Sequence, residues 1–314
     1  MRGDADQHRA TAIQWITTIS ALILVCIAGY LTGVYEGYKR SWPVPQLRGI
    51  FEARFDRSAI RTDAFGRLLR YPGKITIPCP AQDQDTAVLV VFGQSNAANF
   101  QGQRYTGLGD RVVNFSEGKC YLASSPLLGA DGKYGEPWTL LGNKLVSDHL
   151  YTKVILIPAG VGSSSVHQWA RGSSLNRMLL TVIREAKQHY TITGLLWHQG
   201  ATDVAQHTSE EAYKSDLMSL IDSLRAEGVT APFYISRSSL QLSPAWSPDN
   251  PIARAQAALL DGKSILAGPN TDRDISALDR YDGLHFSATG QEKFTDAWLK
   301  LLRRPAGAEK ADEP

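Results

Sequence analysis

The sequence predicts an α/β protein in which helices cover both faces of a parallel sheet. Four short apolar runs have the length of buried strands, at 87–93, 153–160, 192–200 and 231–239. Amphipathic segments of helical length separate these runs. Strands that are apolar on both faces and alternate with helices are typical of a parallel sheet that is buried on both sides.

Helices are expected between these strands and after the last one, at 137–150, 175–190, 209–228, 250–262 and 288–304. The last of these helices closes the domain, so the globular part is expected to span 86–304. The segment 305–314 is short and polar and is predicted to be disordered.

The N-terminal part of the chain carries a long uncharged segment. No charged residue occurs from Ala10 to Tyr35, and residues 13–34 are long enough to cross a hydrocarbon core of about 30 Å. We therefore expect a tail, 1–12, followed by one transmembrane helix over 13–34. A cleaved signal peptide is the alternative, although the apolar run is longer than a usual signal core.

The charges around this segment do not settle its orientation in a membrane, because basic residues flank it on both sides. They are Arg2, Arg9, Lys39, Arg40 and Arg48. Residues 35–85, which follow the segment, are expected to form a stem that ends in a short strand pair around 68–78.

Composition and motifs exclude several classes of function. The net charge is +2, which gives no electrostatic reason to expect a nucleic-acid partner. The sequence contains no CxxC pair, no HExxH and no glycine-rich phosphate loop. We therefore expect neither a metal nor a cofactor.

The cysteines leave two possibilities open. Cys26 lies in the apolar N-terminal segment, whereas Cys79 and Cys120 lie in the globular part. In an oxidising compartment Cys79 and Cys120 can pair; otherwise they are two separate buried thiols.

Candidate catalytic residues follow the ends of the expected strands, which is where parallel sheets carry their active sites. Ser95 follows the first strand, where it can act as a nucleophile or simply cap the next helix. Gly162 follows the second strand and can offer a backbone N–H to an oxyanion. Gln199 follows the third and can offer a side-chain N–H, whereas we interpret the neighbouring His198 as structural.

Asp282 and His285 stand three residues apart on a loop before the last helix. At this spacing one turn can place the carboxylate on one imidazole nitrogen and leave the other nitrogen for a serine. The pair supplies a better candidate base than His198.

Four blocks of the sequence, in this order, resemble the SGNH hydrolase superfamily: GQSN (93–96), GSSSVHQW (162–169), WHQG (197–200) and DGLHFS (282–287). The resemblance covers about residues 86–302 and is closest to the sialate O-acetylesterase and carbohydrate esterase family 6 group. It implies a flavodoxin-like three-layer α/β/α sandwich, the SGNH hydrolase fold. It also implies metal-free hydrolysis of acetyl esters, often on sugars.

Carried over to this chain, the resemblance makes Ser95 the nucleophile, His285 the general base and Asp282 the residue that orients the base. The backbone N–H groups of Ser95 and Gly162 and the side chain of Gln199 would form the oxyanion hole.

The chain departs from the family pattern at two positions. Ala201 stands where members often carry Glu, and Ser163 stands where the group often has a second Gly. Asn96, Trp169 and Asp203 are candidate substrate-binding residues, with core packing as the alternative role for Trp169.

The sequence therefore predicts a membrane-anchored serine esterase that removes O-acetyl groups from a carbohydrate or polysaccharide. Its catalytic domain is expected to be periplasmic or otherwise extracytoplasmic, on a single-pass membrane anchor. Two alternatives remain open: an O-acetyltransferase with the same triad, and a catalytically silent glycan-binding or scaffold protein on the same fold.

Overall fold

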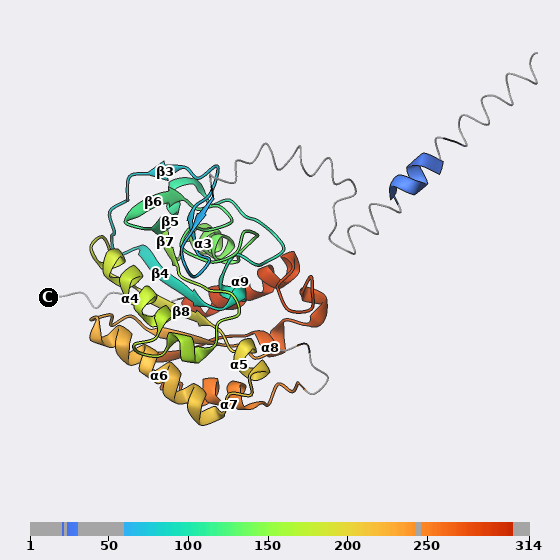
Figure 1. Cartoon of the computed structure of the whole chain (residues 1–314). Helices are drawn as coiled ribbons and strands as arrows, with labels where there is room; N and C mark the ends of the chain where they lie inside the picture. The colour runs from blue at the N-terminus through green and yellow to red at the C-terminus, as the bar shows by residue number, and fades with distance from the viewer. Residues whose placement is uncertain (1–20, 22–23, 31–59, 241, 243–245, 304–314) are drawn as a thin grey trace, which may run out of the picture. The chain divides into compact units, whose positions relative to one another are not determined.

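The computed structural model describes Ala21 and residues 24–30, 60–240, 242 and 246–303 (Figure 1). Its contacts divide the chain into two units, Met1–Ala59 and Ile60–Pro314. The fold and the candidate site lie in the second unit.

The structure describes only part of the predicted transmembrane segment 13–34. Ala21 and residues 24–30 are helical and exposed. Among the described residues, no helix is both long enough and apolar enough to span a bilayer. The rest of that segment, the tail 1–12, most of the stem and residues 305–314 lie outside the described residues.

The described part of the second unit contains an eight-stranded sheet with the order β10-β9-β8-β4-β7-β5-β6-β3. Its strands are β3 (Thr76–Ile77), β4 (Thr86–Gly93), β5 (Val112–Ser116), β6 (Lys119–Leu122), β7 (Lys153–Pro158), β8 (Gly194–His198), β9 (Phe233–Arg237) and β10 (Ile265–Asn270). The six strands from β10 to β5 are parallel, and β6 and β3 extend the β5 edge in antiparallel fashion. The predicted parallel α/β sheet is confirmed.

The strand pair expected around 68–78 differs from the prediction. β2 (Leu68–Arg70) pairs with β1 (Arg61–Thr62) in a separate two-stranded sheet. β3, by contrast, pairs with β6 at the edge of the main sheet. The two short strands therefore belong to different sheets.

The helices that surround the sheet are α3 (Trp138–Ser147), α4 (Ser174–Lys187), α5 (Ala201–Ala205), α6 (Glu210–Ala226), α7 (Pro251–Ala258), α8 (Thr271–Asp274) and α9 (Ala288–Leu302). Short 3-10 helices occur at η2 (Ser95–Ala97), η3 (Gly109–Arg111), η4 (Val166–Trp169) and η5 (Ala277–Asp279).

The side chains of β4 show why the molecule has three layers. Every residue of this strand is buried, and successive side chains point to opposite faces of the sheet. Val88, Val90 and Phe92 pack in one apolar cluster with α4 and α6. Ala87, Leu89 and Val91 pack in a second cluster with α3 and α9. Helices therefore cover both faces of the sheet (Figure 1).

The order of the strands indicates where a site belongs. Along the sheet, β7, β4, β8, β9 and β10 have the flavodoxin-like order 2-1-3-4-5, with β5 added beside β7. Strand β7 pairs with β4 on one side, and the later strand β8 pairs with β4 on the other side. The direction in which strands are added to the sheet therefore reverses at β4. Ligands of such sheets bind outside the carboxyl ends of the strands at this switch point.

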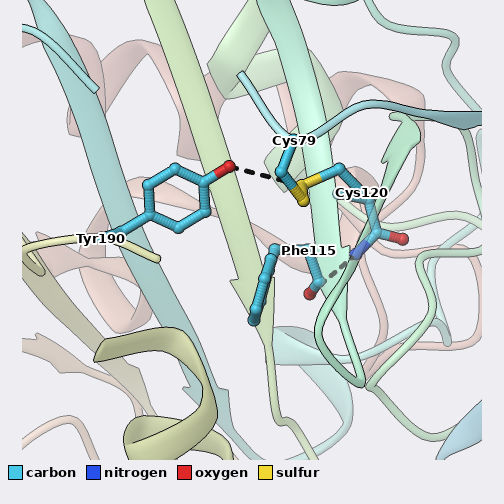
Figure 2. The surroundings of a disulfide bond; sticks show 5 residues. Cys79, Phe115, Cys120 and Tyr190 are labelled. Atoms are coloured by element: carbon cyan, nitrogen blue, oxygen red, sulfur yellow. Dashed lines mark hydrogen bonds between the residues drawn. A yellow bond between two sulfur atoms is a disulfide. The ribbon is translucent and has the colours of Figure 1, made fainter. Parts of the chain in front are cut away.

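Cys79 and Cys120 form a disulfide between the segment after β3 and strand β6, with their Cα atoms 5.0 Å apart. Figure 2 shows the Tyr190 hydroxyl beside the Cys120 sulfur, 3.3 Å away, and Phe115 on the neighbouring strand β5. The bond resolves the alternative that the sequence left open, and it ties the two edge strands together.

Candidate active site

Ser95 lies two residues after the end of β4, at the switch point of the sheet. Gly93 ends the strand with a φ of +127°, and a Cβ there would lie 2.2 Å from the carbonyl oxygen of His198. Only glycine fits this close approach of two strands. Ser95 then opens the 3-10 helix η2 and is almost fully buried.

A chain of hydrogen bonds joins Ser95 to two residues at the far end of the sequence. His285 Nε2 lies 2.9 Å from Ser95 Oγ, and His285 Nδ1 lies 2.7 Å from Asp282 Oδ2. The structure therefore brings together the three residues that the sequence singled out for a triad. Each imidazole nitrogen has one partner, which is the arrangement in which a histidine can move a proton from a hydroxyl.

Asp282 also shapes the loop that carries the histidine. Its Oδ1 accepts backbone N–H groups of Leu284 at 3.0 Å and His285 at 2.7 Å. Burial raises the pKa of Asp282, but these bonds and the one from the His285 ring outweigh burial and hold the pKa below its usual value. The carboxyl is therefore ionised at neutral pH and stabilises positive charge on the imidazole.

Two aromatic rings stack on the imidazole of His285. The ring of Phe100 stacks on it at a centroid distance of 5.9 Å, and the ring of Tyr281 stacks on it at 6.0 Å. The Tyr281 hydroxyl donates to the carbonyl oxygen of Phe100 at 2.6 Å. The sequence analysis missed both rings, although Tyr281 directly precedes Asp282.

Asn96, a predicted substrate-binding residue, bonds to the loop that carries His285. Its side chain is buried, with Nδ2 donating to the carbonyl oxygen of Leu284 at 3.1 Å and Oδ1 accepting from Phe286 N at 3.3 Å. Both bonds reach the loop that carries His285. Asn96 therefore joins the nucleophile turn to the histidine loop.

Arg280 also bonds to the loop that carries His285. Its guanidinium donates to the carbonyl oxygens of Leu284 at 2.6 Å and Thr271 at 3.2 Å, and lies 4.9 Å from the centroid of the Phe286 ring. Burial lowers the pKa of Arg280 to about 10, so the group remains charged at neutral pH. No sequence motif pointed to this residue.

Gly162, a predicted oxyanion donor, already has an acceptor. Its N–H donates to Asp131 Oδ2 at 3.0 Å, and the other oxygen of this carboxylate accepts from Gly132 N at 2.7 Å. The Gly162 N–H is therefore oriented toward an anion, but that anion belongs to the protein. Asp131 lies in a long connection without periodic signals, so no sequence pattern pointed to it.

Gln199, a predicted oxyanion donor, and Asp203, a predicted substrate-binding residue, bond to each other inside the protein. The two side chains are fully buried. Gln199 Nε2 donates to the carbonyl oxygen of Ser164 at 3.0 Å and to the Asp203 carboxylate, so both of its protons are used. Asp203 also accepts from Val166 N at 2.9 Å and Thr208 Oγ1 at 3.0 Å. Burial raises the pKa of Asp203.

Trp169 is part of the core, which is the role that the sequence left open beside substrate binding. It is fully buried, its Nε1 donates to Ser164 Oγ at 2.9 Å, and its ring packs edge to face on Trp197 at 5.5 Å. His198 is also buried, with Nε2 3.0 Å from Ser238 Oγ. Burial, assisted by the charge of Arg280, lowers the pKa of His198 to about 3, so its ring is neutral.

Gln94 is a further residue of the site that was missed. Its Oε1 accepts the N–H groups of Gly200 at 3.0 Å and Thr202 at 3.3 Å, at the start of α5. The residue before the nucleophile is thereby bound to the connection that follows β8. The GQSN block contained this residue, but its partners lie about a hundred positions away.

Comparisons with known proteins identify the family to which the chain belongs. A family model described as carbohydrate esterase, sialic acid-specific acetylesterase, matches residues 85–300. No curated protein sequence gives a significant match. Among solved structures, a protein from Arabidopsis thaliana is 17% identical with a TM-score of 0.55, over 69% of this chain and 97% of that one.

Two further structures are similar at lower scores. The psychrotrophic esterase EstA from Pseudoalteromonas sp. is 16% identical with a TM-score of 0.44, over 70% of this chain and 100% of that one. The family 3 carbohydrate esterase of Clostridium thermocellum is 13% identical with a TM-score of 0.43, over 70% of this chain and 100% of that one. Because the family model covers more than half of the chain, the protein belongs to the carbohydrate esterase family of sialic acid-specific acetylesterases and is a hydrolase of ester bonds.

Proposed function

We propose that this protein is a serine esterase that removes O-acetyl groups from a carbohydrate, with Ser95 as nucleophile, His285 as general base and Asp282 as the residue that orients the base. The observation that supports this most directly is the unbroken chain of hydrogen bonds from Ser95 Oγ through the imidazole to the Asp282 carboxylate. The family match supports an acetyl ester on a sugar as the substrate.

In the first half of the reaction, Ser95 Oγ attacks the acetyl carbonyl carbon while His285 Nε2 takes the hydroxyl proton. The carbonyl π electrons move to oxygen and form a tetrahedral oxyanion. When the intermediate collapses, the C–O bond to the sugar breaks and His285 returns the proton to the departing sugar oxygen. The acetyl group is left on Ser95.

In the second half, His285 takes a proton from water as the water oxygen attacks the acetyl carbon. The bond to Ser95 then breaks, the serine oxygen recovers the proton from His285, and acetate leaves. Asp282 stays ionised throughout and stabilises the imidazolium that forms in each half.

We revise the set of oxyanion donors that was predicted from the sequence. The backbone N–H of Ser95 remains a candidate because it opens η2 beside the attacking oxygen. The N–H of Gly162 can serve once Asp131 releases it. Gln199 is removed from the set because its two protons are used inside the core. Each working donor contributes about 10²–10³-fold in rate.

Substitution of the nucleophile tests the proposal. Ser95→Ala is expected to abolish hydrolysis of p-nitrophenyl acetate and labelling by a fluorophosphonate probe, with the circular dichroism spectrum unchanged. The matched control is Ser215→Ala, which removes an exposed serine hydroxyl from α6. Undiminished hydrolysis by Ser95→Ala would rule out this residue as nucleophile.

Product analysis separates the hydrolase from the two alternatives. With an O-acetylated glycan in water we expect free acetate. Acetyl transfer to an added sugar acceptor, with little acetate, would instead identify a transferase. A protein that neither reacts with the probe nor deacetylates any glycan would be a binding or scaffold protein.

We further infer that residues 13–34 anchor the domain to a membrane and that the domain lies in an oxidising compartment. The uncharged length of this segment supports the first point. The Cys79–Cys120 disulfide supports the second, because such bonds persist mainly outside the cytoplasm. Full-length protein is expected in the membrane fraction after a carbonate wash, whereas a chain that starts at Ile60 is expected in the supernatant.

A further inference from the structure

A cavity of about 580 Å³ lies between the end of α5 and the start of α7, and none of the triad residues lines it. Its size is in the usual range of small-molecule sites. One wall is formed by the end of α5 and the residues after it, Val204–Ser209, and the other by residues 246–252, which lead into α7. Helices α5 and α7 are in contact (Figure 1).

The topology places this cavity on the same edge of the sheet as Ser95. Ser95 follows the carboxyl end of β4, the first wall follows that of β8, and the second wall follows that of β9. The strands β4, β8 and β9 are consecutive neighbours in the sheet. At about 4.8 Å between neighbouring strands, β4 and β9 are about 10 Å apart.

Direct contacts connect the cavity walls to the candidate site. The connection that carries the first wall begins at Gly200, four residues before the wall itself, and the Gly200 N–H donates to Gln94, the neighbour of Ser95. The connection that carries the second wall also reaches the histidine loop, because a Cβ on Gly283 would lie 2.9 Å from a methyl carbon of Leu242. The connections that carry the two walls therefore each contact a segment that carries a triad residue.

The lining combines an aromatic ring with polar groups. Trp246 Nε1 donates to the carbonyl oxygen of Ser239 at 2.9 Å, which fixes the indole in the wall. Val204 and Ile252 add apolar surface, whereas the His207 imidazole and the Asp249 carboxylate add polar groups at the rim. Asp249 is itself held by Arg254, with Nη1 and Oδ1 3.2 Å apart.

We propose that this cavity binds a sugar unit of the substrate other than the one that carries the acetyl group, so that the preferred substrate is an oligosaccharide or polysaccharide. This inference rests on the proposed function. A pyranose ring has C–H faces that pack on an indole and a rim of hydroxyls that bond to carboxylate and imidazole groups. Binding energy from this remote unit then helps to hold the ester at Ser95.

The test compares long and short substrates on the full-length protein. Wild type is assayed on a panel of chemically O-acetylated oligosaccharides of glucose, xylose and N-acetylglucosamine, on the matching acetylated monosaccharides, and on p-nitrophenyl acetate. We expect kcat/KM to be at least fivefold higher for one oligosaccharide than for its monosaccharide. Trp246→Ala is expected to remove this preference and leave p-nitrophenyl acetate turnover unchanged.

Two controls sharpen the comparison. Trp246→Phe keeps an aromatic face and is expected to retain most of the preference for the oligosaccharide. Tyr134→Ala removes another exposed aromatic ring, outside the cavity lining, and is expected to change nothing. The proposal fails if wild type shows no preference for any oligosaccharide, or if the preference survives in Trp246→Ala.

A binding measurement separates this proposal from the proposed function. The unacetylated oligosaccharides are added to the Ser95→Ala variant, and saturation-transfer NMR reports their contact with the protein. Contact that disappears in the double variant Ser95→Ala, Trp246→Ala supports the cavity even if esterase activity is absent. Turnover of p-nitrophenyl acetate without oligosaccharide contact would instead support the esterase and overturn the cavity.

Discussion

The ring of Tyr281 stacks on the imidazole of His285, with 25° between the two ring planes. The Tyr281 hydroxyl also donates to the carbonyl oxygen of Phe100, whose ring stacks on the same imidazole. The two stacked rings hold the imidazole in the orientation in which Nε2 faces Ser95 and Nδ1 faces Asp282.

Tyr281→Leu is therefore expected to lower kcat for p-nitrophenyl acetate about tenfold to a hundredfold with little change in KM. The reason is that the imidazole loses one of the two aromatic rings that hold its orientation. Tyr281→Phe keeps the ring and loses only one hydrogen bond, so its loss is expected to be about fivefold or less. Steady-state kinetics of both variants decide the point. Equal losses in the two variants would show that the hydroxyl, and not the stacked ring, matters.

Asn96→Ala is expected to lower kcat while KM stays within about twofold. The substitution removes the two hydrogen bonds that join the nucleophile turn to the histidine loop. It leaves the buried Phe286 N–H without its acceptor, whereas the Leu284 carbonyl keeps its bond from Arg280. The thermal midpoint should fall as well, since those groups lie in the fold. If KM rises and kcat is unchanged, Asn96 binds substrate as the sequence first suggested.

Asp131→Asn is expected to raise kcat/KM, by about tenfold. An oxyanion that accepts from Gly162 N lies close to the Asp131 carboxylate, and two negative charges about 4 Å apart repel by about 4 kcal/mol at an effective dielectric constant near 20. The amide keeps an acceptor for the loop and removes the charge. A fall in kcat/KM with an unchanged thermal midpoint would show instead that the carboxylate assists the reaction.

Asp282 is expected to make stability depend on pH in the acid range. Because its folded pKa lies below the usual value of 3.8, its stabilising contribution is fully present above that value. The contribution is lost as the pH falls through the lower, folded value. Urea unfolding at a series of pH values should therefore show a smaller loss of stability below pH 4 in Asp282→Asn than in wild type.

The same variant checks the triad at neutral pH. Asp282→Asn removes the charge that stabilises the imidazolium and favours the wrong ring tautomer, so kcat is expected to fall by about 10³–10⁴-fold. Asp222→Asn, an exposed position on α6, serves as the control for a change of charge. Activity close to that of wild type in Asp282→Asn would remove the carboxylate from the proposed mechanism.

Residue patterns predicted the buried part of the sheet well. β4, β7, β8 and β9 are apolar strands between amphipathic helices, and all four were expected. β10 was missed because it lies at the sheet edge, is partly exposed, and contains Gly268 and Pro269. β5 and β6 were missed as well, since the connection that contains them has no helical or strand period long enough to recognise.

At the site, short sequence spacing was a better guide than residue type. Asp282 and His285 are three positions apart, so one turn determines how they meet, and the structure brings them to Ser95. Gln199, Asp203 and Trp169 carry side chains that suit a substrate site, but their backbone positions direct them into the core. Which side of a loop is buried depends on packing between distant segments, and a single sequence does not contain that information.

The hydroxyl of Ser95 and the imidazole that would deprotonate it are 190 positions apart. The serine leaves the ribosome with the first core strand, whereas the histidine emerges only after β10, shortly before the final helix. On the proposed mechanism, a nascent chain that has not yet emerged as far as His285 lacks the base that activates Ser95, so it does not hydrolyse esters during its synthesis. Cleavage of the chain before Asp282 would inactivate the protein in the same way.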